Sequence, residues 1–228
     1  YGSDNPADYT PLWQWSSIWN LVKLAAPLAV VAGIGSVFQN IPRVVIEKTH
    51  GREELGYFTA MAMLLVALTM VNQALGNTTL PRLSKYFVEN KKAFMWLFIR
   101  LIGLNLCLGT AFVAIAFFFG ESVLTVLFTA EYARHNNVFV ILAISGCVLS
   151  IFAVSNSALN ATRQFAVQVP IYVGTAVISG IFSLLLIPKY GIMGGAFVLV
   201  INYLFGTTMC LFFVIRAIRR KNDNAGQS

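Results

Sequence analysis

The sequence predicts an all-α, polytopic membrane protein, and three observations lead to this fold class. Of the 228 residues, 57% are hydrophobic and only 11% are charged, whereas soluble domains contain about 25% charged residues. The apolar residues form long runs between short polar joints, and a soluble core could not bury so much apolar surface. The runs also lack the alternating pattern of a membrane barrel. Helices are therefore expected, because in lipid each helix pairs its own backbone groups.

Six apolar runs are long enough to cross a bilayer as helices. Each has about 21 to 25 residues, and a helix rises about 1.5 Å per residue across a hydrocarbon core of about 30 Å. We expect six transmembrane helices at 24–45, 57–79, 95–119, 138–159, 167–187 and 192–215.

The segments around these spans predict three parts of the chain. Residues 1–23 are expected to form a polar N-terminal segment and an interfacial lead-in, because several tryptophans precede the first span. Residues 24–217 hold the six-helix transmembrane part, and residues 218–228 form a tail that we expect to be disordered from Asn222 onward. The apolar stretch 122–128 is too short to cross, so we expect a separate short helix in the membrane interface.

The distribution of Lys and Arg predicts the orientation. The joints that share a side with both termini hold eleven of these residues, and the opposite joints hold five. Because cytoplasmic loops carry an excess of positive charge, we expect both termini in the cytoplasm. The net charge of +7 arises in these joints and not on an amphipathic stripe, so we expect no nucleic-acid partner.

The reactive side chains predict neither an enzyme nor a bound cofactor or metal. His50 and His135 lie in charged joints, and the three cysteines lie in apolar runs without neighbours at metal-ligand spacing. The sequence has no glycine-rich phosphate loop, no nucleophile elbow and no pair of carboxylates within a span.

Polar residues inside the spans are the candidate functional residues. A polar group facing lipid costs several kcal/mol, so such residues face either a partner helix or a water-filled cavity. Asn156 and Asn160 are four residues apart and should share a helix face. The candidates for a substrate cavity are Gln39, Asn40, Arg43, Asn72, Gln73, Asn156, Asn160 and Asn202.

Arg43 is the most specific of these candidates, because it follows Pro42 near the end of the first span. Its guanidinium could reach outward to lipid head groups, or it could meet an anionic ligand at the outer end of a cavity. Pro42 removes one backbone hydrogen bond, so that together with Pro27 it offers two positions where the first span could bend.

Several short motifs occur in an order that resembles a known family. They are Asn40-Ile-Pro-Arg43, Leu55-Gly-Tyr-Phe-Thr-Ala60, Ala74-Leu-Gly76, Pro81-Arg-Leu-Ser-Lys-Tyr86, Val126-Leu-Phe128 with Glu131-Tyr132, Asn156 through Arg163, and Leu186-Ile-Pro-Lys-Tyr-Gly191 with Gly194-Gly-Ala196. Together they resemble the second half of the Wzx-type flippases, which belong to the multidrug/oligosaccharidyl-lipid/polysaccharide exporter superfamily. The resemblance covers nearly the whole chain, and it rests on the order of the motifs because each alone is unspecific.

This resemblance implies a MATE-like fold, in which two six-helix lobes face each other in a V around a central cavity. The chain would be the C-terminal lobe, and its partners would be membrane lipid, a lipid-linked oligosaccharide and the missing N-terminal lobe. The implied function is to flip that oligosaccharide across the bacterial inner membrane by alternating access, for surface polysaccharide such as lipopolysaccharide O-antigen. Arg43 would then be one member of a cationic lumen.

Two other functions are compatible with the sequence. A cation-coupled multidrug exporter of the same superfamily needs an acidic residue inside a span, but all nine Asp and Glu lie in joints or termini. A non-transporting membrane scaffold is the alternative from a different class.

Overall fold

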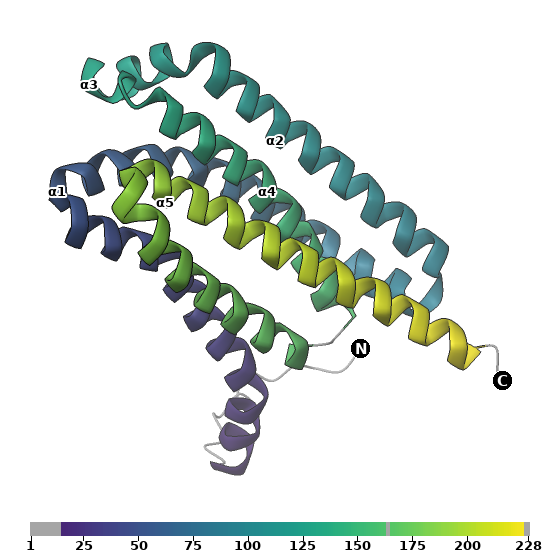
Figure 1. Cartoon of the computed structure of the whole chain (residues 1–228). Coiled ribbons are helices and arrows are strands. Elements are labelled where there is room, and N and C mark those ends of the chain that lie inside the picture. Colours follow the sequence, from purple (N-terminus) through teal and green to yellow (C-terminus); the bar gives the residue numbers. More distant parts are fainter. Residues whose placement is uncertain (1–14, 163–164, 226–228) are drawn as a thin grey trace, which may run out of the picture.

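The computed structural model describes residues 15–162 and 165–225, and every element in these two ranges is helical. In chain order (Figure 1) the elements are α1 (Trp15–Glu89), α2 (Lys91–Leu127), α3 (Ala130–Ala133), α4 (Asn136–Ala161) and α5 (Phe165–Ala225). The predicted polar segment 1–10 lies outside the described residues. The all-α fold class is thus confirmed for the part of the chain that the structure describes.

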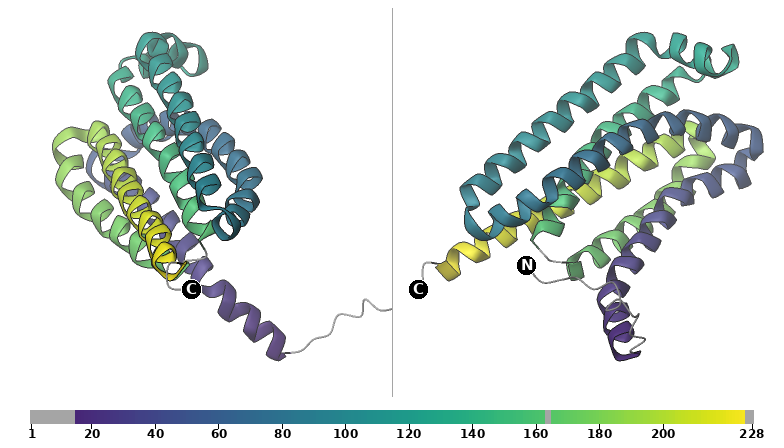
Figure 2. Two further views of the ribbon diagram at one scale, coloured as in Figure 1. Left: turned by 90° about the vertical axis from the view of Figure 1, so that its right-hand side faces the viewer. Right: turned by 180° about the vertical axis from the view of Figure 1, so that it is seen from behind.

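Four helices are long and apolar enough to cross a membrane. They contain the segments Gly33–Glu89, Lys91–Leu127, Asn136–Ala161 and Val167–Ile218. The helix α4 is the most buried one, because 56% of its most apolar 18-residue stretch is buried, and it contacts α1, α2 and α5. The helix α2 lies at the edge, with only 22% of its most apolar 18-residue stretch buried, and Figure 2 shows it on the outer side of α4.

Two glycines reverse the chain inside α1 and α5. Gly51 has φ 89° and Gly191 has φ 59°, which are backbone conformations that glycine adopts without a steric penalty. Each long helix is therefore a pair of arms, and Figure 1 shows the two arms of each pair running back alongside each other. The two glycines lie in joints that the sequence places between predicted spans.

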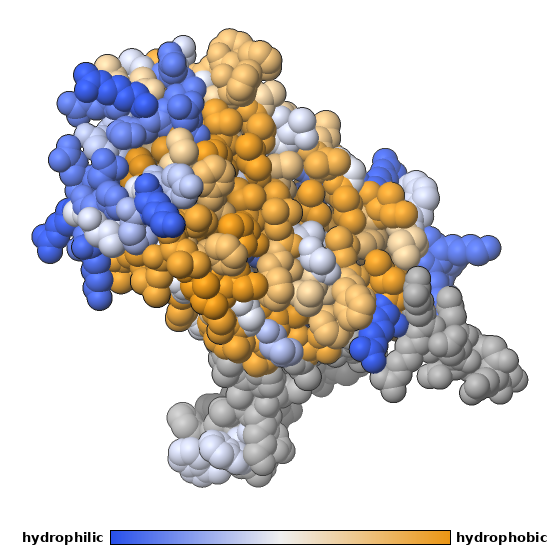
Figure 3. All heavy atoms as spheres, viewed as in Figure 1, coloured by the Kyte–Doolittle hydropathy of each residue, from blue (hydrophilic) through white to orange (hydrophobic). Residues whose placement is uncertain are grey.

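Both glycine turns and α3 lie at the same end of the bundle. The hydroxyl of Tyr57 lies 3.1 Å from Glu53 Oε1 and 3.5 Å from Glu131 Oε2 of α3. A Cβ atom at Gly191 would lie 3.6 Å from the ring of His50. Figure 3 shows hydrophilic surface at this end and at the opposite end, with an apolar belt between them. This distribution fits a bundle whose middle lies in hydrocarbon.

The prediction of a separate interfacial helix at 122–128 is wrong. The helix α2 continues without a break to Leu127, and the short helix that follows it is α3. Gly120 lies within α2 and not at its end, at the point where α2 approaches the start of α4. A Cβ atom there would lie 2.0 Å from Asn136 Oδ1 and 3.3 Å from the ring of Phe139.

The predicted disorder from Asn222 onward is also wrong over residues 222–225, which belong to α5. Once a helix exists, each further residue adds one hydrogen bond at little additional cost, so polar composition alone does not end it. Residues 226–228 lie outside the described residues.

Candidate functional site

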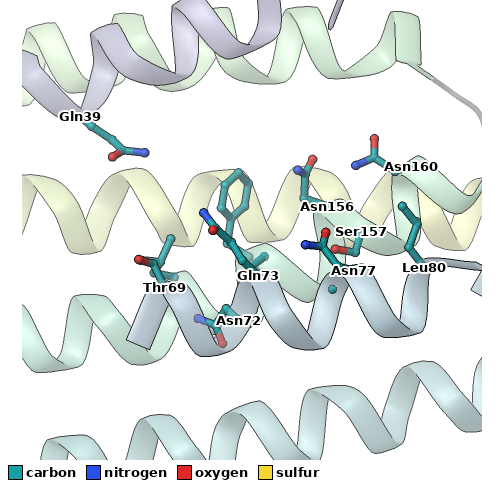
Figure 4. Close-up of a pocket in the computed structure, with 13 residues that line it drawn as sticks. Gln39, Thr69, Asn72, Gln73, Asn77, Leu80, Asn156, Ser157 and Asn160 are labelled. Atoms are coloured by element: carbon teal, nitrogen blue, oxygen red, sulfur yellow. The ribbon is translucent and has the colours of Figure 1, made fainter. Parts of the chain in front are cut away.

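A polar cavity of about 420 Å³ opens between the two arms of α1 and the helix α4 (Figure 4). Eight of its thirteen lining residues carry an amide or a hydroxyl group, and none of the thirteen carries a charge. We call this space the amide cavity. Its lining residues are Gln39, Thr69, Asn72, Gln73, Gly76, Asn77, Leu80, Leu149, Phe152, Ala153, Asn156, Ser157 and Asn160.

Five of the eight residues proposed from the sequence lie in this wall. Figure 4 shows Gln39 reaching in from the first arm of α1, while Gln73 stands on the second arm. Asn156 and Asn160 come from successive turns of α4, so they share one face of that helix. The remaining one, Asn72, lies beside Gln73 but points to another side of the arm.

Hydrogen bonds to neighbouring helices hold two of these amides. Asn72 is buried, and its Nδ2 donates to Ser150 Oγ of α4 at 2.9 Å. Asn160 Oδ1 accepts a hydrogen bond from Nε2 of the buried Gln168 in α5. The oxygens Asn72 Oδ1 and Asn156 Oδ1 have no hydrogen-bond partner in the described structure. Both oxygens are buried in the packed wall, so they are not exposed to the cavity.

Arg43 lines a smaller adjoining cavity of about 170 Å³, which shares Gln39, Thr69 and Leu149 with the amide cavity. We call it the arginine cavity. The guanidinium of Arg43 donates a hydrogen bond to Asn40 Oδ1 at 3.4 Å. Within the described ranges, the salt bridges join Arg52 to Glu47 and Lys85 to Glu89, so neither involves Arg43. The cation of Arg43 is therefore not neutralised by a carboxylate in the described part of the chain.

Two of the proposed residues lie outside both cavities. Asn40 faces an apolar groove on another side of α1, and its Nδ2 donates to Ser36 O at 2.9 Å. Asn202 is fully buried in α5, where neither its Nδ2 nor its Oδ1 has a hydrogen-bond partner in the described structure. The structure thus places six of the eight proposed residues in the walls of the two cavities. Asn40 lies outside both walls but accepts the hydrogen bond from Arg43, whereas Asn202 lies outside both and is fully buried.

Four polar residues of the site were not among the proposed ones. Asn77 lies one turn after Gln73 in the wall of the amide cavity. Thr69 lies one turn before Gln73 and lines both cavities, so the helical period from Gln73 could have found it. Ser157 follows Asn156 directly. Gln168 donates a hydrogen bond to Asn160 from a different helix. The sequence gives little sign of this role, because Gln168 is a lone amide at the start of an apolar run.

Comparison with known proteins identifies the family. The apolar helices fit a multi-pass membrane protein, and a polar cavity opens between them. Residues 6–136 match the family of polysaccharide biosynthesis proteins. The chain is 31% identical over 180 residues to the capsular polysaccharide biosynthesis protein CapF of Staphylococcus aureus. The aligned region covers 78% of this chain and 46% of CapF. The chain therefore belongs to this family of polysaccharide biosynthesis proteins.

The chain spans about half the length of the curated relative that it matches. A comparison with solved structures gives no significant match. The family expected from the sequence motifs is confirmed.

Proposed function

We propose that the protein is part of a flippase that moves a lipid-linked oligosaccharide across the bacterial inner membrane by alternating access, for surface polysaccharide synthesis. The observation that carries this proposal is an uncharged polar cavity inside a bundle of apolar helices, next to an arginine that has no carboxylate partner in the described part of the chain. Sugar hydroxyls need amide partners, and a pyrophosphate needs a cation. Membership of a family of polysaccharide biosynthesis proteins supports this substrate class.

The proposed architecture is one six-helix lobe of a MATE-like transporter, facing a second lobe. The two arms of α1, the two arms of α5, α2 and α4 would supply the six crossings. The 46% coverage of CapF leaves room in that relative for a second lobe of similar length. The proposed lobe is the C-terminal one, as the motif order implies.

The proposed orientation places both termini in the cytoplasm. The turns at Gly51 and Gly191 lie with α3 at one end, where the sequence has fewer positive charges than in the joints on the other side. The arginine cavity is then closer to the outer face, since Arg43 precedes the Gly51 turn by only eight residues.

A cation-coupled multidrug exporter is the second candidate, and the composition of the cavities counts against it. Neither the amide cavity nor the arginine cavity is lined by a carboxylate, and coupling by a cation uses an acidic side chain within the membrane. A non-transporting scaffold has no need of a polar cavity within apolar helices. The flippase is therefore the function that the geometry supports best.

The test is to replace the chromosomal gene by variants of the full-length protein and to measure surface polysaccharide. Arg43→Gln should lower surface polysaccharide and raise the amount of lipid-linked oligosaccharide in the inner leaflet. A charge-assisted hydrogen bond is worth about 1.5–3 kcal/mol, so we expect about tenfold slower transport. Arg52→Gln is the matched control, because Arg52 is exposed and bonded to Glu47. Normal polysaccharide in Arg43→Gln cells would remove Arg43 from the mechanism, and normal polysaccharide without the gene would reject the proposed function.

A further inference from the structure

We propose that the two adjoining cavities divide the substrate by charge, so that the amide cavity binds uncharged sugar rings while Arg43 binds the anionic group. This inference rests on the proposed function and names the part of the substrate that each cavity recognises. It makes the amide cavity a specificity site for neutral sugars and the arginine cavity a site for any anion attached to them.

The chemistry of the wall matches hydroxyl groups. The side-chain amides of Gln73 and Asn77 each offer donors and an acceptor, as a sugar hydroxyl itself does. A wall built for phosphate or carboxylate would present guanidinium or ammonium groups, which form the stronger charge-assisted bonds. All thirteen described residues that line the amide cavity are uncharged, so this part of the wall presents no counter-charge for a bound anion.

The amides that face the cavity give a bound hydroxyl specific positions. Gln168 occupies the oxygen of Asn160, so the amide donors of Asn160 remain for a ligand. Gln73 and Asn77 are exposed, and neither makes a hydrogen bond to protein in the described structure, so their donors and acceptors are open to a sugar hydroxyl. Asn72 offers no such position, because its Nδ2 donates to Ser150 Oγ and its Oδ1 is buried.

The size and position of the two spaces support one ligand that extends through both. The amide cavity of about 420 Å³ lies within the range of about 300–1,000 Å³ that is typical of small-molecule sites. Gln39 and Thr69 line both cavities, so a sugar seated against the amides is continuous with a group at Arg43. The described salt bridges leave Arg43 uncompensated, which suits it to an incoming negative charge.

The experiment compares a neutral and an acidic disaccharide of the same skeleton. Cellobiose and cellobiouronic acid differ by one carboxylate, and their binding to the full-length protein in phospholipid nanodiscs can be followed by saturation-transfer NMR. The wild-type protein should bind both sugars, with the acidic one held more tightly. Arg43→Gln should weaken cellobiouronic acid about tenfold and leave cellobiose unchanged.

Variants of the wall should give the complementary result. Asn77→Leu and Gln73→Leu should each weaken both sugars about fivefold, since each removes a neutral hydrogen-bond partner. Both residues are exposed to the cavity, and neither makes a hydrogen bond to protein in the described structure, so the fold should tolerate the changes. Asn137→Leu is the control, because this exposed amide of α4 lies outside both cavities.

Two outcomes would overturn the inference. One is that only the acidic sugar binds to the wild-type protein, and the other is that Asn77→Leu and Gln73→Leu bind cellobiose as tightly as the wild type does. These outcomes are distinct from failure of the proposed function. If cellobiose binding follows the predicted pattern but cells without the gene keep normal surface polysaccharide, the flippase proposal fails and the sugar site stands. If those cells lose their polysaccharide while cellobiose does not bind, the sugar site fails and the flippase proposal stands.

Discussion

The hydroxyl of Ser179 in α5 donates a 2.8 Å hydrogen bond to the main-chain carbonyl of Phe38 in α1. In an uninterrupted helix this carbonyl would accept from the amide of residue 42, but Pro42 has no N–H. The proline thus removes a backbone donor, and a side chain of another helix supplies one at the same carbonyl. This explains why α1 continues through Pro42 and reverses only at Gly51, although the sequence offered Pro42 as a position to bend.

Ser179→Ala should therefore destabilise the contact between α1 and α5. The carbonyl of Phe38 would lose its partner within the buried interface, which we expect to cost about 1 kcal/mol. Reversible unfolding by titration with a denaturing detergent would measure the change in the free energy of unfolding. Ser183→Ala is the control one turn further along α5, since the buried Ser183 Oγ has no partner and its removal should cost nothing.

A second change tests the role of Pro42 directly. In Pro42→Ala, residue 42 regains an N–H that can bond to the carbonyl of Phe38, so adding Ser179→Ala to this variant should have a smaller effect. Equal losses of stability from Ser179→Ala with and without Pro42 would show that the hydroxyl does not compensate for the proline.

Gly191→Ala should destabilise the reversal between the two arms of α5. At φ 59° and ψ −139° an alanine is strained, and such conformations cost about 1–3 kcal/mol. Gly180→Ala on the same helix provides the comparison, because no atom lies within 4 Å of an added Cβ there. An alanine inside a helix gains about 0.5–1 kcal/mol over glycine, so this control should be more stable than the wild type. The prediction is that Gly191→Ala unfolds at a lower midpoint than Gly180→Ala, and the opposite order would contradict it.

Gly109→Ala should push α2 away from α4. A Cβ atom at residue 109 would lie 2.8 Å from Cys147 Cα, so backbone has to move. Overpacking of this kind costs about 1–3 kcal/mol, and the loss should appear in detergent unfolding. Gly103→Ala lies in the same helix with open space around it and should lose no stability. Equal behaviour of the two variants would mean that α2 is not held at this crossing.

Local periodicity explains which parts of the site the sequence predicts. Asn156 and Asn160 share a wall because a spacing of four residues keeps them on one helix face. The same reasoning does not predict that Gln39 and Gln73 line one cavity, because these residues lie on opposite arms of α1. Their proximity depends on the turn at Gly51 and on the packing of both arms against other helices.

The residues that the sequence misplaces show where periodicity gives no answer. Asn40 follows Gln39 directly, but a step of one residue turns it by about 100° onto another face of α1. Asn202 is an amide in an apolar run, as Asn156 is, yet it is buried away from both cavities. Whether such an amide meets a cavity or the interior depends on the neighbouring helices, which no local pattern encodes.

The pairing of Asn72 with Ser150 predicts an asymmetry between two single variants. Ser150→Ala removes the acceptor of Asn72 Nδ2, and because Asn72 Oδ1 is already unpaired, the whole amide would be left buried without a partner. Asn72→Leu removes that polar group, while Ser150 keeps its own hydrogen bond to Gly146 O at 3.0 Å. Ser150→Ala should therefore be the more destabilising of the two.

The double variant completes a thermodynamic cycle for this pair. Interhelical hydrogen bonds in membrane proteins average about 0.6 kcal/mol, with a maximum of about 1.7 kcal/mol. We expect a coupling energy in this range from the free energies of unfolding of the wild type, the two single variants and the double variant. A coupling near zero would mean that the hydrogen bond between Asn72 and Ser150 does not help to hold α1 against α4. Asn72 would then be held in the cavity wall by the packing of its helix alone.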